Sequence, residues 1–537
     1  MRQTQLEALK TQDQFDILVI GGGATGCGIA ADAAARGLSV ALVEKGDFAG
    51  GTSSRSTKLV HGGVRYLEAA IKHLDKVQYQ LVKEGLHERG AFLRNAPHLA
   101  HRLALVTPVY SWWELPYIYI GLKLYDILSG TMNIGKSTMI SARTALKHFP
   151  TLRAEGLKGA VVYYDGQFND IRMAMTLILT AQQHGGVAVN YCAVESLTKD
   201  GDGRIDGAVI EDRLTGERFP VKAKTVVNAC GPFAEAILRM DDPEAKPILK
   251  GAEGVHIILD RDKIPLDVGL LIPKTDDGRV LFLLPWEGHI IVGTTDEPTE
   301  IVEKPVAPEA DVAYLLDYVR RYFKTDVTEK DVKAAWCGIR PLVFDPKAKD
   351  TSQLAREHVL FESKSGLITI AGGKWTIYRL MAEHTVDRAI RVGKLNPARA
   401  CVTHDMRLVG GCHYAADMDK VLATRHGLPA DVAESLVRSY GDQVGKILAL
   451  ITEHGMERLS PNHPFLEVEV RHAVREEQAV HAADVLIRRL TFALTDTEAA
   501  LAAVDRVVAL MAEELGWDKA RQEEERADAK TRVAAGL

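Results

Sequence analysis

The chain of 537 residues is long for a single domain, so we expect two or three domains. Hydrophobic residues make up 46% of it and charged residues 26%, which are the proportions of an ordinary globular protein. The net charge of −6 gives no reason to expect a nucleic-acid partner. The six cysteines are scattered without a CxxC pair, so we predict neither a disulfide framework nor a metal site.

The segment 15–44 has the pattern of a dinucleotide-binding unit. An apolar run over 17–20 predicts a buried parallel strand, and a second strand is expected from Leu38 to Val43, just before Glu44. The glycines between them have the spacing GxGxxG and are Gly21, Gly23 and Gly26. They allow a tight turn, the approach of a pyrophosphate to a helix N-terminus, and close packing of that helix on the strand. Glu44 can accept both hydroxyls of a ribose, so a Rossmann-type site for FAD or NAD, rather than NADP, is predicted.

The loop over 51–67 is rich in hydroxyl groups and glycine. Its candidates for bonds to phosphate or flavin oxygens are Thr52, Ser53 and Ser56. Lys58 can add positive charge. A solvated Ser/Thr loop is the alternative, which we disfavour because the loop continues into HGGVRYLE and places His61 and Arg65 beside a second glycine pair.

Residues 21–68 resemble the start of the FAD-dependent glycerol-3-phosphate dehydrogenases, which belong to the D-amino-acid-oxidase-like flavoprotein superfamily. Further matching segments are KTVVNACGPF, GAEGVHIILD, GIRPLV, LAREHVLF and GGKWTIYR, and the resemblance extends over about residues 15–520. Cys230 stands where threonine is more usual in that family. We interpret Cys230 as a tolerated small residue rather than a catalytic thiol.

The resemblance implies a non-covalently bound FAD. The cofactor-binding residues predicted from the motif and the resemblance together are Gly21, Gly23, Ala24, Thr25, Gly26, Glu44, Thr52, Ser53, Ser56, Lys58, Leu59, His61, Gly231, Gly372, Gly373, Lys374, Trp375 and Thr376. The segment around the last five predicts a strand, a glycine turn and a helix start, which is another natural place for flavin contacts.

The activity implied is oxidation of sn-glycerol 3-phosphate to dihydroxyacetone phosphate, with hydride transfer from C2 to flavin N5 and electrons passed to a membrane quinone. An oxidase that uses O₂ and releases H₂O₂ is the alternative, and an amino-acid oxidase or a flavoprotein without turnover is less favoured. The expected catalytic residues are His256 as base, Arg340 and Lys374. The expected substrate-binding residues are Arg65, Tyr66 and Arg356, because a phosphate dianion requires a cationic pocket. Structural ion pairs are the alternative role for each basic residue.

The fold class expected is α/β (α+β), in three parts. A Rossmann-type FAD-binding domain over about 15–70, 185–235 and 335–395 is interleaved with a mixed-sheet substrate domain over about 71–184 and 236–334. Helical spacing and few glycines after residue 395 predict an all-helical C-terminal domain, 396–537.

The stretch 108–130 carries six aromatic residues and is too interrupted to span a membrane. It can lie in a membrane interface or form an aromatic core. Resemblance to peripheral membrane enzymes favours the interface, and we expect attachment to the inner face of the cytoplasmic membrane. The polar N-terminus lacks an apolar h-region, and no D-x-D-x-D-G calcium loop occurs, so a bacterial-type enzyme is expected, and a homodimer is possible.

Overall fold

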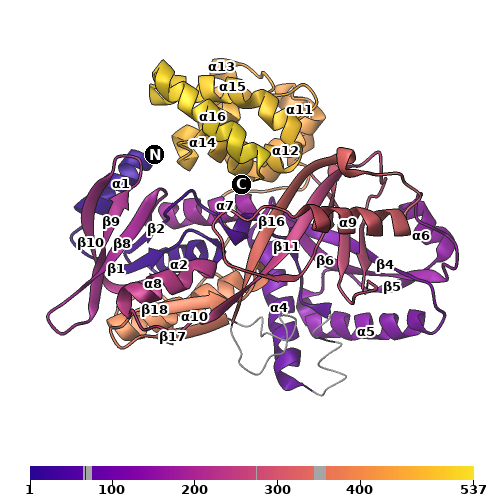
Figure 1. Ribbon diagram of the computed structural model, residues 1–537, viewed down its shortest axis with the longest axis horizontal. Helices are drawn as coiled ribbons and strands as arrows, with labels where there is room; N and C mark the ends of the chain where they lie inside the picture. Colours follow the sequence, from indigo (N-terminus) through magenta and orange to yellow (C-terminus); the bar gives the residue numbers. More distant parts are fainter. Residues whose placement is uncertain (65–66, 68–74, 274, 344–357, 537) are drawn as a thin grey trace.

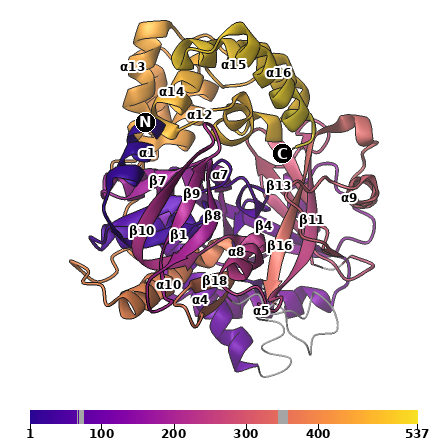
Figure 2. The same cartoon turned by 60° about the vertical axis from the view of Figure 1, so that its left-hand side comes forward.

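The computed structural model describes residues 1–64, 67, 75–273, 275–343 and 358–536. Two mixed sheets lie side by side, and a group of helices from the end of the chain lies across the top of both in the two views (Figures 1 and 2). The predicted fold class is therefore confirmed. All six cysteines are unpaired.

The first sheet has the strand order β17-β18-β10-β1-β2-β7, and β8 and β9 extend it from β10. Its strands are β1 (Phe15–Ile20), β2 (Val40–Val43), β7 (Val187–Val189), β8 (Cys192–Lys199), β9 (Ile205–Asp212), β10 (Glu217–Asn228), β17 (His358–Glu362) and β18 (Ile368–Gly372). The central strand β1 pairs in parallel with β2 and β10, while β8, β9 and β10 form the antiparallel meander that the sequence predicts. Strand β2 begins at Val40, two residues later than expected.

Helices cover both faces of this sheet. They are α1 (Arg2–Thr11), α2 (Ala24–Ala35), α7 (Asp170–Gln183), α8 (Ala234–Asp241) and α10 (Tyr378–Gly393). Helix α2 contacts both α7 and α10, and its alanines and Ile29 form a core with apolar side chains of β1 and β2. The small side chains of α2 allow this close packing, which brings its N-terminus against the end of β1.

The second sheet runs β15-β11-β14-β13-β12-β4-β6-β3, with β16 paired to β11 and β5 to β6. Its strands are β3 (Leu59–Val60), β4 (Ala100–Val109), β5 (Thr138–Ser141), β6 (Gly159–Phe168), β11 (Leu249–Asp260), β12 (Gly269–Ile272), β13 (Leu281–Trp286), β14 (His289–Gly293), β15 (Glu297–Thr299) and β16 (Val332–Val343). The helices beside it are α4 (Lys76–Asn95), α5 (Glu114–Ser129), α6 (Ala142–His148) and α9 (Glu309–Tyr322). Antiparallel pairing of β11 with β16 sets Arg340 opposite Ala252 and Trp336 opposite His256.

The C-terminal part is all helical after α10, as predicted. Its helices are α11 (Met418–His426), α12 (Ala430–Tyr440), α13 (Val444–His454), α14 (Glu467–Glu477), α15 (Thr497–Leu515) and α16 (Lys519–Ala534), and a π-helical turn covers Asp484–Arg489. Leu486, Phe492 and Val504 share one buried core with Trp336 of β16, so this part is packed onto the second sheet through apolar contacts.

No described helix is long and apolar enough to cross a membrane. Over the same residues, no group of His, Cys, Asp or Glu side chains is arranged to hold a metal ion.

Candidate functional site

A cavity of about 860 Å³ opens at the carboxyl end of β1 and is lined from both sheets and from the C-terminal helices. Most residues predicted to bind a cofactor or to act in catalysis line it. They are Gly21, Gly23, Ala24, Thr25, Glu44, Thr52, Ser53, Ser56, Leu59, His61, Gly231, His256, Arg340, Gly372, Gly373, Lys374, Trp375 and Thr376. Arg65, Tyr66 and Arg356 lie outside the described residues, so their predicted role in substrate binding stays a prediction.

The GxGxxG glycines produce the cradle that the sequence predicts. Gly21 has a φ of +110°, and a Cβ on it would lie 2.7 Å from the carbonyl oxygen of Ala229. A Cβ on Gly26 would lie 1.8 Å from the carbonyl oxygen of Gly21. Gly26 does not line the cavity, and its lack of a side chain lets α2 approach β1. Gly23 is the N-cap of α2, and the hydroxyl of Ser53 accepts from the N–H of Ala24 at 2.8 Å, so Ser53 lies at the helix start to which a pyrophosphate would bind.

Glu44 is held at the end of β2 by two backbone groups. Its Oε2 accepts a hydrogen bond from the N–H of Gly22 at 2.7 Å, and its Oε1 accepts one from Gly46 at 2.9 Å. Burial raises the pKa of Glu44, while these two bonds favour the charged form. The carboxylate oxygens retain lone pairs for ribose hydroxyls, so the cradle and Glu44 together fit the adenosine and pyrophosphate of FAD.

Lys58 is placed differently from its neighbours in the hydroxyl-rich loop. Its side chain is fully buried, and its Nζ lies 2.6 Å from Oδ1 of Asp170 on α7. The Nζ also donates to the carbonyl oxygen of Ser54 at 2.8 Å. Burial lowers the pKa of Lys58, and Asp170 opposes that shift. Lys58 is not among the cavity-lining residues, and its ammonium fastens the loop to α7 instead of facing a cofactor phosphate.

His256 is buried on β11 and is held on two sides. Its Nε2 lies 2.8 Å from Oγ1 of Thr57, and its ring stacks on Trp336 with centroids 5.4 Å apart and an interplanar angle of 13°. Its Nδ1 has no hydrogen-bond partner among the described residues. Burial lowers the pKa of His256 well below its ordinary value, and the charges of Arg340 and Lys58 lower it further. The ring is therefore neutral at physiological pH, as a general base must be.

Arg340 lies on β16 opposite Ala252, where its charge acts on His256, and four hydrogen bonds to described residues orient it. Its Nη1 donates to the carbonyl oxygen of Glu253 at 3.0 Å and to Oδ1 of Asp296 at 3.1 Å. Its Nη2 donates to Oγ1 of Thr294 at 3.0 Å and to the carbonyl oxygen of Thr295 at 3.2 Å. These contacts fix the guanidinium plane at the cavity wall, where it presents positive charge in one orientation.

Four cavity-lining residues that bear on the site were missed from sequence: Arg55, Thr57, Arg488 and Arg532. Arg55 is buried and donates to the carbonyl oxygen of Cys337 at 3.2 Å, and burial lowers its pKa to about 10, so it remains charged near neutrality. It sits within the same loop as Ser53 and Ser56, which could have indicated it. Thr57 gave no signal apart from that loop. Arg488 and Arg532 come from the C-terminal helices, and nothing in their local sequence distinguishes them from surface arginines.

The Rossmann-type cradle, the ribose-binding carboxylate and the cavity shared with a substrate sheet define an FAD-dependent oxidoreductase. Family models agree: that of the FAD dependent oxidoreductases matches residues 16–387, and that of the C-terminal domain of alpha-glycerophosphate oxidase matches residues 401–522.

Comparison with known proteins narrows the class. The chain is 47% identical over 539 residues to the mitochondrial glycerol-3-phosphate dehydrogenase of Mus musculus, covering 98% of this chain and 74% of the mouse protein. The Arabidopsis thaliana mitochondrial enzyme is 44% identical, covering 98% and 87% respectively. The crystal structure of the Bacillus halodurans glycerol-3-phosphate dehydrogenase complexed with FAD superimposes with a TM-score of 0.80 at 30% identity, over 100% of this chain and 98% of that one. The chain belongs to the FAD-dependent glycerol-3-phosphate dehydrogenase family, and its cofactor is FAD.

Proposed function

We propose that the protein oxidises sn-glycerol 3-phosphate to dihydroxyacetone phosphate. The observation that carries the proposal is the position of His256, which is neutral, buried and beside Arg340 on the wall of the cavity that also contains the FAD cradle. Relatives named glycerol-3-phosphate dehydrogenase match 98% of this chain, which supports the same substrate here.

The chain's own residues have distinct tasks in this reaction. Bound FAD supplies the acceptor for the hydride that leaves C2 of the substrate. His256 takes the proton of the C2 hydroxyl, and the Thr57 hydroxyl at Nε2 fixes its ring orientation. Burial of the ring keeps it unprotonated and ready to accept.

The substrate phosphate needs positive charge, and the cavity wall supplies it. Arg340, Arg55 and Lys374 all line the cavity. The Nη groups of Arg340 already donate to protein oxygens, so Arg340 supplies charge that attracts the phosphate and thereby helps to fix the position of C2. Arg65, Tyr66 and Arg356 are proposed to complete this pocket.

We further propose that electrons pass to a membrane quinone and that the protein binds the cytoplasmic membrane peripherally at its inner face. Helix α5 and the turn before it support membrane binding because Trp112 and Trp113 are 68% and 67% exposed, and Ile127 is 71% exposed. Tryptophan is favoured where hydrocarbon meets headgroups. A homodimer stays a prediction.

A reoxidation experiment tests the acceptor. The enzyme is reduced with substrate without oxygen and then mixed with a soluble quinone analogue or with dissolved O₂. We expect the quinone to restore the oxidised flavin spectrum faster. Faster recovery with O₂ and stoichiometric H₂O₂ release would instead support an oxidase. The likeness to the L-alpha-glycerophosphate oxidase of Mycoplasma pneumoniae, at 16% identity and a TM-score of 0.57, shows a shared fold alone and does not favour that outcome.

A further inference from the structure

We propose that the helical C-terminal domain is part of the cofactor site: Arg488 and Arg489 hold the loop 44–51 in its FAD-binding conformation through Asp47, and so raise the affinity for FAD.

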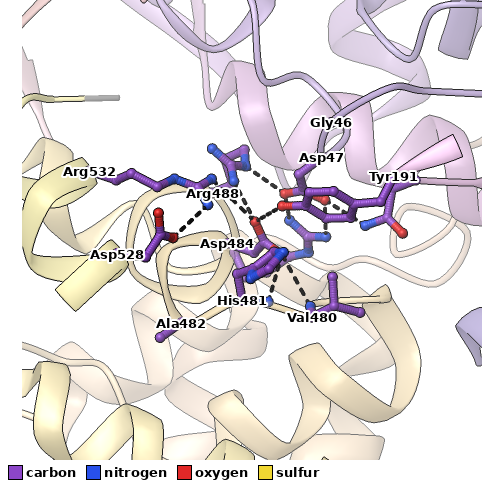
Figure 3. Close-up of polar contacts among 12 residues, drawn as sticks. Gly46, Asp47, Tyr191, Val480, His481, Ala482, Asp484, Arg488, Asp528 and Arg532 are labelled. Carbon is purple, nitrogen blue, oxygen red and sulfur yellow. Dashed lines mark hydrogen bonds and ion pairs between the residues drawn. The ribbon is translucent and has the colours of Figure 1, made fainter. Parts of the chain in front are cut away.

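Asp47 is the point of contact between this loop and the C-terminal domain (Figure 3). Its side chain is fully buried. Its Oδ2 accepts from Nε of Arg488 at 2.5 Å and from Nη1 of Arg489 at 2.7 Å, and its Oδ1 accepts from Nη2 of Arg489 at 2.8 Å. Asn190 donates to the same Oδ1 at 2.9 Å. The carboxylate therefore has a bidentate partner and two further donors.

This arrangement depends on charge. A buried carboxylate without a partner would be neutralised, but the two guanidinium groups hold the pKa of Asp47 well below its ordinary value. Loss of a single partner leaves an uncompensated buried charge, which is why such pairs tolerate substitution poorly. The loop 44–51 is therefore held to the C-terminal domain at every pH at which Asp47 is ionised.

Arg488 is itself fixed by Asp484, which begins the π-helical turn. Its Oδ1 accepts from the hydroxyl of Tyr191 at 2.6 Å and from Nη2 of Arg488 at 2.5 Å (Figure 3). Its Oδ2 accepts from the backbone N–H groups of Val480 and His481 at 3.1 and 3.0 Å. Arg488 therefore reaches the loop with its orientation already set.

Hydrogen bonds connect the loop that carries Asp47 to Glu44 and to the glycine cradle, which are the groups predicted to bind FAD. Asp47 lies three residues after Glu44, and the carbonyl oxygen of Gly46 accepts from Tyr191 N–H at 2.8 Å. Two residues beyond Asp47, the N–H of Ala49 donates to the carbonyl oxygen of Gly22 at 2.9 Å, within the glycine cradle. The carboxylate of Glu44 accepts hydrogen bonds from the N–H of Gly22, in the glycine cradle, and from the N–H of Gly46, in the loop 44–51. Release of Asp47 would thus displace both the ribose carboxylate and the cradle.

The C-terminal domain also contributes to the cavity wall itself. Arg488, Asp528 and Arg532 all line the cavity, and Arg532 Nη1 lies 3.1 Å from Oδ2 of Asp528. A domain that merely packed beside the flavin domain would not supply lining residues.

The alternative is that these pairs only dock one domain on another. A matched control exists in Asp32 of α2, a fully buried carboxylate whose Oδ2 lies 2.7 Å from Nη2 of Arg36 and whose Oδ1 accepts from the hydroxyl of Thr403 at 3.3 Å. Neither Asp32 nor Arg36 lines the cavity. Asp47→Asn and Asp32→Asn each remove one buried carboxylate that is paired with arginine.

The test measures FAD affinity separately from folding. Full-length apoprotein of each variant is titrated with FAD, with quenching of flavin fluorescence as the readout, and thermal unfolding of the apoprotein is followed in parallel. We expect Asp47→Asn to raise the Kd for FAD by about tenfold or more. Asp32→Asn should lower the apoprotein Tm about as much as Asp47→Asn does, while its Kd for FAD stays near that of the parent.

Two results would overturn the proposal: an unchanged Kd in Asp47→Asn, or Kd values in both variants that rise in proportion to the loss of apoprotein Tm. If Asp47→Asn does not fold, Arg488→Lys keeps the charge and loses the set geometry. An elevated Kd with nearly parental Tm in Arg488→Lys then supports the proposal, and a parental Kd contradicts it.

Discussion

The hydroxyl oxygen of Thr57 lies 2.8 Å from Nε2 of His256, and both residues line the cavity. Because Thr57 is the polar partner that orients the ring, we predict that Thr57→Val lowers the rate of flavin reduction by about tenfold to a hundredfold, within the range of general-base effects. Thr57→Ser keeps the hydroxyl and should retain most of the rate. Single-turnover reduction followed at the flavin band measures both variants, and equal rates for Val and Ser would show that the hydroxyl is not used.

The pH dependence follows from the environment of His256. Burial, Arg340 and Lys58 all lower its pKa, so the ring stays neutral from about pH 8 down to about pH 6. We predict a limiting rate of flavin reduction that is flat over this range. A substrate phosphate with a second pKa of about 6 affects binding instead, and appears as a rise in Kd on the acidic side. A limiting rate that halves near pH 6.5 would indicate an ordinary histidine pKa.

Gly26 provides a test of the cradle without touching the ligand. A Cβ at this position would lie 1.8 Å from the carbonyl oxygen of Gly21, so Gly26→Ala must push α2 away from β1. We expect loss of bound FAD and a lower free energy of unfolding, by about 1–3 kcal/mol or more. Gly121→Ala is the control, because a Cβ there meets nothing within 4 Å on the helix α5. Retention of FAD by Gly26→Ala would contradict the packing argument.

The burial of Glu469 should make the stability of the C-terminal domain depend on pH. Burial raises its pKa to about 7, although Leu466 N–H and Tyr440 donate to it. Between the unfolded value of about 4.3 and this folded value, the folded state holds a proton that the unfolded chain releases. The free energy of unfolding therefore falls as pH rises through this window.

Replacement of Glu469 by glutamine should remove this fall in the free energy of unfolding at higher pH. We expect Glu469→Gln to raise the Tm relative to the parent at about pH 8 and to change it little at about pH 5. Differential scanning calorimetry at the two pH values measures the difference. A Tm gap that is the same at both would show that Glu469 is not protonated in the folded state.

If helix α5 and the turn before it bind the membrane, substitutions there should weaken membrane binding and leave catalytic activity intact. Trp112 and Trp113 together should carry much of the affinity for the interface. We expect Trp112→Ser with Trp113→Ser to lower co-sedimentation with anionic phospholipid vesicles several-fold, while flavin reduction by substrate is unchanged. Val421→Ser, at an exposed apolar position of the C-terminal domain, is the control. Equal sedimentation of both would place the membrane contact elsewhere.

The predictable features of this protein are those encoded locally. The strand, glycines, helix and Glu44 lie within one short segment, so spacing alone located the cradle. His256 and Arg340 were found by resemblance, and the pairing of β11 with β16 places them on neighbouring strands of one sheet. What sequence reasoning missed depends on distant partners. Lys58 forms an ion pair with Asp170, which lies 112 residues away in the sequence, and no local sequence pattern indicates that pairing.

The same limit applies to the C-terminal domain. Its helical spacing predicted a separate unit, yet Arg489 bonds Asp47 across 442 residues and Arg488 lines the cofactor cavity. Periodicity identifies which face of a helix is buried, but it does not identify the segment against which a buried arginine will be paired. The segment boundaries proposed for the interleaved domains stay predictions.

The most direct measurement is an anaerobic titration of the purified flavoprotein with sn-glycerol 3-phosphate, followed at the oxidised flavin band. We predict stoichiometric bleaching of the band, and no bleaching by glycerol at the same concentration, because glycerol lacks the phosphate that the positive charge of Arg340 and its neighbours attracts. An unchanged band with sn-glycerol 3-phosphate, in a sample whose flavin dithionite still reduces, would contradict the proposed substrate and the role given to His256.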